Sequence, residues 1–82
     1  MTRATRVMLE QYEVQIKSLK DNYAILRRDL VSLDKGNICY ETNAINILMR
    51  MKETRDKYRT MENIVLGIEA ANSVLVNADD KE

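Results

Sequence analysis

The stretch "LEQYEVQIKSLKDNYAILRRDLVSL", residues 9–33, carries a large apolar or tyrosine side chain at spacings that alternate between three and four residues. This alternation is the heptad pattern, in which positions a and d of each seven-residue repeat form one stripe along an α-helix. The pattern predicts a helix that packs against another helix along this stripe. The members of the first stripe are Leu9, Tyr12, Ile16, Leu19, Tyr23, Leu26, Leu30 and Leu33.

A second stripe with the same spacing follows a short break in the chain. Gly36 can adopt the left-handed conformation that ends a helix, and Asn37 or Thr42 can cap the next one. A short connection makes consecutive helices antiparallel neighbours, so the sequence predicts an all-α, coiled-coil-like helical hairpin as one domain. The expected elements are helices over about 3–35 and 42–77, a turn over about 36–41 and a flexible tail over 78–82. The members of the second stripe are Ala44, Ile47, Met51, Thr54, Tyr58, Met61, Val65, Ile68, Asn72 and Leu75.

The heptad positions also predict how the two helices are aligned. Layers of similar volume pack most closely, which favours large side chains opposite small ones. This condition is met when Leu33 lies opposite Ala44 and Tyr23 lies opposite Thr54. The alignment that results is a hypothesis about the core of a single hairpin.

Gly67 interrupts the second stripe's helix and has three interpretations. It is a tolerated glycine that costs about 1 kcal/mol relative to alanine. Alternatively, it permits close approach of another helix, since Ala70 and Ala71 follow it. A third interpretation is a break that starts a short third helix at residue 68.

The two flanks of the first stripe differ in charge. Heptad positions b and e are mostly charged, whereas positions c and g carry mainly glutamine, serine, asparagine and apolar side chains. A two-helix hairpin buries only one side of each helix, and uncharged side chains cost less to bury than ions. We therefore expect a homodimer, a four-helix bundle, that forms through the c and g positions. We call this surface the uncharged face, and its members are Met8, Gln15, Asn22, Ile25, Ile64, Gly67, Ala71 and Val74.

The stretch "RMKETRDKYR", residues 50–59, is rich in basic side chains that lie on two different flanks. Arg50 and Lys57 occupy g positions, while the others share a flank with basic residues of the first helix, and Lys20 is expected to face Arg55. Such a cluster is either a solvated surface or a site for an anionic protein or nucleic acid. No aromatic side chain is interleaved for base stacking. We call this cluster the basic face, and its members are Lys17, Lys20, Arg27, Lys52, Arg55 and Arg59.

An apolar cluster lies near the start of the second helix. Met49 and Met51 come together there with Ile45 and Leu48. Methionine-rich surfaces accept varied partners. The alternative interpretation is that these side chains cover the turn end of the bundle.

The residues needed for common catalytic chemistry are missing from this sequence. It contains no histidine, no glycine-rich phosphate loop and no nucleophile elbow, so we expect no enzyme activity, no metal and no cofactor. Cys39 is the single cysteine. It has two interpretations, a small apolar side chain that fills space or a reactive thiol.

The remaining composition limits the partners and the compartment. The 82 residues include 13 basic and 13 acidic side chains, so bulk electrostatic attraction to a membrane or nucleic acid is not indicated. A lone cysteine and the lack of a long apolar run favour a cytoplasmic protein that does not enter a membrane.

These features together predict a small non-enzymatic interaction module, such as an adaptor, an assembly chaperone or an inhibitor. It would act by docking a helix face against itself and against another protein. The alternative function is a nucleic-acid-binding hairpin that uses the basic face.

Overall fold

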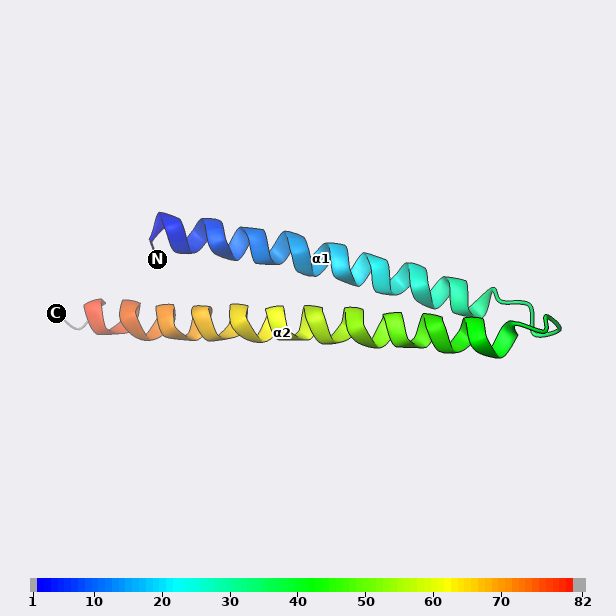
Figure 1. Ribbon diagram of the computed structural model, residues 1–82. Helices are drawn as coiled ribbons and strands as arrows, with labels where there is room; N and C mark the ends of the chain where they lie inside the picture. The colour runs from blue at the N-terminus through cyan, green and yellow to red at the C-terminus, as the bar shows by residue number, and fades with distance from the viewer. Residues whose placement is uncertain (1, 81–82) are drawn as a thin grey trace.

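The protein is an antiparallel hairpin of two long α-helices. The computed structural model describes the backbone of residues 2–80 and the side chains of residues 2–73. The two helices are α1 (Arg3–Val31) and α2 (Tyr40–Asp80), and they pack side by side in a rod of 69 × 16 × 14 Å (Figure 1). The helical hairpin predicted from the heptad pattern is therefore confirmed.

Local hydrogen bonds set the two ends of α1. Thr2 is extended, with φ −74° and ψ 158°, and its hydroxyl oxygen accepts a bond of 3.2 Å from the amide of Thr5, which caps the helix. At the other end the Ser32 hydroxyl donates to the Arg28 carbonyl at 2.8 Å. Serine side chains that bond to nearby carbonyls compete with helix propagation, and α1 ends at Val31, before the expected end near residue 35.

Two side chains organise the turn between the helices. Asp34 accepts a hydrogen bond of 2.9 Å from the amide of Gly36, and Asn37 accepts one of 2.8 Å from the amide of Cys39. Both are Asx-type turns, in which the side chain replaces a backbone acceptor. Over residues 2–80 no glycine has a positive φ, so the expectation of a left-handed Gly36 is wrong. The Asx turns reverse the chain without it.

The core is one seam between the two helices. Every position of the first stripe is buried or half-buried, and so is every described position of the second stripe, from Ala44 to Asn72. Leu9, Met51 and Val65 are the most buried, at 7%, 8% and 9% exposure. No side chain among residues 2–73 is completely buried. The seam is therefore narrow, as expected of two helices without a second layer.

Contacts along and beside the seam differ from the predicted alignment, by about one turn of α2 at Tyr23 and about two turns at Lys20. The Tyr23 ring meets the Tyr58 ring edge to face, with centroids 6.1 Å apart, although Thr54 was expected opposite it. Side chains lean toward the N-terminus of their own helix. In an antiparallel pair the side chains of α1 therefore lean away from the turn, and those of α2 lean toward it. A side chain of α1 then meets a residue of α2 that lies further from the turn than the residue directly opposite its own backbone.

The same lean changes the partner of Lys20. Its ammonium lies 5.5 Å from the centroid of the Tyr58 ring and 3.5 Å from Glu62 Oε1. The expected juxtaposition with Arg55 is therefore replaced by an ion pair and a cation–π contact.

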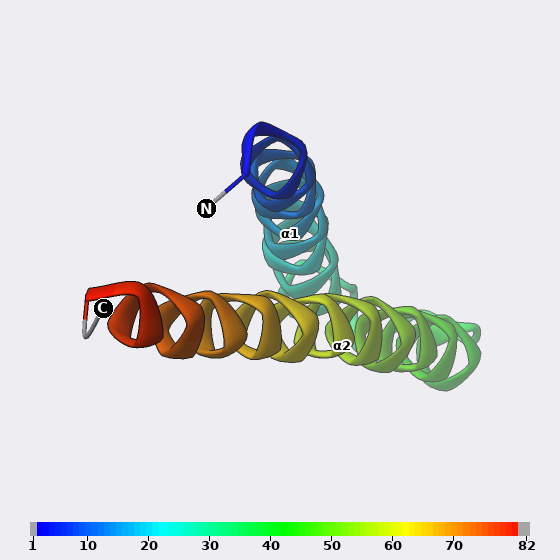
Figure 2. The same ribbon diagram turned by 90° about the vertical axis from the view of Figure 1, so that its left-hand side faces the viewer.

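α2 passes through Gly67 as one helix, and residues 2–80 contain no third helix. A Cβ atom at Gly67 would meet nothing within 4 Å. The helices separate toward the N-terminus of α1 (Figure 1), and the end-on view shows that they cross rather than run parallel (Figure 2). No helix in the described part of the chain has an apolar stretch long enough to cross a membrane.

Candidate functional site

The uncharged face lies open along one flank of the seam. Met8, Ile25 and Ile64 are exposed there, although they are large apolar side chains. The small and polar members of this face are exposed as well. The side chain of Val74 lies outside the described residues. A single hairpin therefore leaves the described members of this face accessible to another protein.

Shallow grooves lie along the part of the uncharged face between Met8 and Ile25 on α1 and up to Ile64 on α2. A groove of about 300 Å³ passes between the helices beside Asn22 and Ile25. A second groove, of about 360 Å³, is lined by Ile64 and by the half-buried ring of Tyr12. A third, of about 280 Å³, lies over Met8 and Gln15. Charged side chains of α2 also line two of these grooves: Arg50, Glu53 and Lys57 line the first, and Asp56 and Lys57 line the second. Concave surfaces of this kind can accept the ridge of a second helix.

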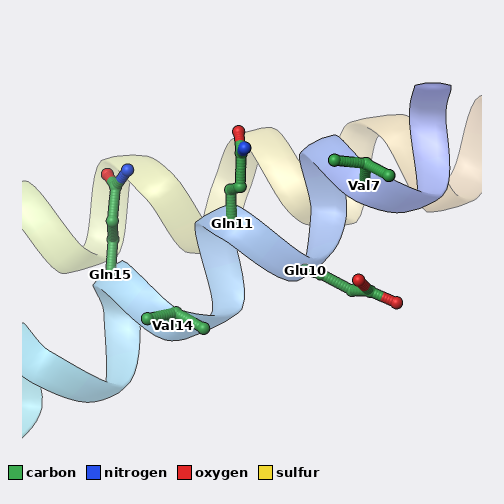
Figure 3. Close-up of a pocket in the computed structure, with 5 residues that line it drawn as sticks. All are labelled: Val7, Glu10, Gln11, Val14 and Gln15. Carbon is green, nitrogen blue, oxygen red and sulfur yellow. The ribbon is translucent and has the colours of Figure 1, made fainter.

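The first half of α1 carries a further groove of about 660 Å³ that sequence reasoning missed. Val7, Glu10, Gln11, Val14 and Gln15 line it. Gln11 and Gln15 project on the same side of α1, while Glu10 points away from them (Figure 3). The missed signal was the pair of valines, which lie seven residues apart on the outward position of the heptad.

The basic face occupies the opposite flank. Lys20 and Glu62 form the one ion pair among residues 2–73. The other basic members therefore have no carboxylate within ion-pair distance in the described part of the chain. Arg55 is half-buried, and its Nε is shielded from water without a hydrogen-bond partner among the described residues. Like charges gathered in this way favour an anionic partner.

Apolar side chains adjoin the basic face near the turn. Met51 of the expected cluster is buried in the seam, but Ile45, Leu48 and Met49 are exposed, as is Val31 of α1. These four residues are named the turn patch. A groove of about 390 Å³ lies next to them on α1, with Ala24, Arg27, Arg28 and Val31 among its lining. The turn patch does not cover the turn of this hairpin, where Ile38 is fully exposed.

Cys39 lies exposed in the turn and is not in a disulfide. Among the residues that the structure describes, no three histidine, cysteine, aspartate or glutamate side chains come close enough to hold a metal ion. The hairpin presents two extended surfaces, the uncharged face on one flank and the basic face on the other.

Comparisons with known proteins give no match to a family model, to a curated protein or to a solved structure.

Proposed function

We propose that this chain is a small non-enzymatic interaction module that pairs with a second copy through the uncharged face, forming a homodimeric four-helix bundle. The observation that carries the proposal is an exposed and grooved flank, with Met8, Ile25 and Ile64 accessible, on a hairpin whose own core is a single narrow seam. A second hairpin would give each helix a second packed side.

The apolar side chains on this face set the scale of the association. Full burial of a large apolar side chain contributes about 1.5–3 kcal/mol, so burying the exposed part of one contributes about 1 kcal/mol. Met8, Ile25 and Ile64 from two chains then give about 6 kcal/mol, before the entropic cost of association. A micromolar dimer needs about 8 kcal/mol net. The polar and groove contacts must supply the remainder, so we expect a dimer that dissociates on dilution.

Such a dimer would present two basic faces outward. An adaptor, assembly chaperone or inhibitor can work by occupying the surface of another protein in this way, without chemistry of its own. The partner would meet the flanks that self-association leaves free.

Two matched substitutions test the placement of the dimer interface. Ile64, 40% exposed, belongs to the uncharged face, whereas Ile45, 56% exposed, lies on the other flank of the same helix. We expect Ile64→Lys to give a helical monomer, because the interface would bury an unpaired charge. Ile45→Lys should keep the wild-type mass.

Light scattering over a range of protein concentrations, with circular dichroism to confirm helicity, distinguishes these outcomes. An Ile64→Lys chain that keeps the dimer mass would rule out this interface. Loss of the dimer in the Ile45→Lys chain alone would move the interface to the other flank.

A further inference from the structure

The flank opposite the uncharged face combines a cluster of basic side chains with exposed apolar ones. It carries basic side chains that have no carboxylate partner among residues 2–73, and it carries the exposed turn patch beside them. A purely solvated surface needs no apolar side chains. Basic and apolar side chains side by side are complementary to a segment that is both acidic and apolar.

We propose that the basic face and the turn patch together form a docking site for an acidic amphipathic helix of another protein. This inference rests on the proposed function as an interaction module and names the chemistry of its partner. The partner's apolar stripe would lie over the turn patch, and its carboxylates would meet the arginines and lysines.

The size of the surface sets the length of the partner helix. Ile45 and Arg59 mark its two ends on α2, and at 1.5 Å per residue they are about 21 Å apart along the helix. A partner helix of about four turns covers this distance. Its apolar residues, at spacings of three and four, would fit the groove of about 390 Å³ beside Val31.

Arg55 is the residue of the basic face that most specifically favours a partner with carboxylate side chains. Its Nε is shielded from water and has no acceptor among the described residues. A guanidinium group binds a carboxylate through two parallel hydrogen bonds, and such charge-assisted bonds are the strongest available to a side chain. Because Nε itself is shielded, a partner carboxylate would satisfy this donor only with the Arg55 side chain turned outward.

A short segment fits this flank better than an extended anionic surface. Glu10, Glu13 and Glu69 share the b and e positions of this flank toward the chain termini. A membrane or a long nucleic acid laid along the rod would bring phosphates against these carboxylates, which is unfavourable. A phosphate backbone also offers nothing apolar to cover the turn patch, and the rings of Tyr23 and Tyr58 are half-buried against each other.

The test uses the full chain and a synthetic peptide of about 16 residues, long enough for four turns. The peptide carries leucines on one face and glutamates on both sides of them, with a fluorescent label for anisotropy. We expect it to bind. The double variant Arg55→Glu/Arg59→Glu should weaken binding at least tenfold, because two attractions become repulsions.

The turn patch is tested by two valines of similar exposure. Val31, 78% exposed, belongs to the patch, and Val14, 69% exposed, lies outside it on the same helix. Val31→Glu should weaken peptide binding about tenfold, whereas Val14→Glu should leave it unchanged. Arg3→Glu/Arg6→Glu is the charge control, since it removes two cations near the other end of α1.

Several outcomes would overturn the proposal. They are failure of the peptide to bind, equal binding of a peptide with lysine in place of glutamate, and tighter binding of phosphatidylserine vesicles or of duplex DNA to the basic face. Solution mass separates this proposal from self-association. A dimer that ignores the peptide refutes only the docking site, and a monomer that binds it refutes only the dimer.

Discussion

Replacing Gly67 by alanine has opposite effects on one hairpin and on a pair of hairpins. In the hairpin Gly67 lies inside α2, and an added Cβ would meet nothing within 4 Å. Alanine is favoured over glycine in a helix interior by about 0.8–1.0 kcal/mol, so the free energy of unfolding should rise by nearly this amount. For a chain of this length, 1 kcal/mol corresponds to about 4–8 °C in Tm.

The proposed dimer reverses this gain. Gly67 and Ala71 lie on the uncharged face, where a small residue lets the second hairpin approach closely. A methyl group forced into such a contact costs about 1–3 kcal/mol by overpacking. Thermal unfolding of Gly67→Ala, followed by circular dichroism, should therefore show a raised Tm in dilute protein and a smaller or negative change in concentrated protein.

The control for this experiment is Asn63→Ala, an exposed position of α2 outside the uncharged face. It should raise stability by about 0.6 kcal/mol at every concentration, from helix propensity alone. An equal gain for Gly67→Ala at all concentrations would show that no close contact forms at Gly67. A lower Tm in dilute protein would show that the space beside Gly67 is not open in the single hairpin.

Three further substitutions, one of them with a matched control, test the hairpin itself. Val65→Ala should lower the free energy of unfolding by about 2 kcal/mol, while Leu66→Ala, at a neighbouring side chain that is 60% exposed, should change it little; urea titrations compare the two. Thr2→Ala removes the cap of α1 and should cost about 1 kcal/mol, seen as faster amide exchange in the first turn. Glu62→Gln breaks the ion pair with Lys20, which is solvent-exposed, so the loss should stay below about 1 kcal/mol and shrink with added salt.

The heptad stripes were readable from sequence because burial in a helical pair follows the 3.5-residue period directly. Leu9, Met51 and Val65 were all stripe positions, and they are the most buried side chains of the described chain. Two polar stripe members, Thr54 and Asn72, are also half-buried, which shows that position decided burial even where hydrophobicity did not.

The contacts beside the stripes were not readable in the same way. Long side chains lean along their helices, and a layer model that pairs residues by backbone level ignores this lean. It therefore assigned Lys20 to Arg55 rather than to Glu62. The prediction of a left-handed glycine in the turn was wrong because it left out side-chain hydrogen bonds. The Asx bonds of Asp34 and Asn37 reverse the chain without such a glycine.

The apolar residues near the turn differ in burial, and only some of them had been predicted to form a surface patch. Met49 and Met51 are the same residue type two positions apart, yet Met51 is buried and Met49 is exposed. The heptad position separates them, because Met51 belongs to the second stripe and Met49 does not. Val31 was not predicted to belong to the patch. It directly follows Leu30, whose apolar character the first stripe accounts for, and it drew no separate interpretation.

Sedimentation equilibrium of the wild-type chain, from dilute to concentrated protein, measures directly whether two hairpins pair. The chain has a mass of 9.5 kDa. We expect twice this mass at high concentration, and we expect the mass to fall toward the monomer value on dilution. A chain that keeps the monomer mass throughout, with full helicity, would contradict pairing through the uncharged face.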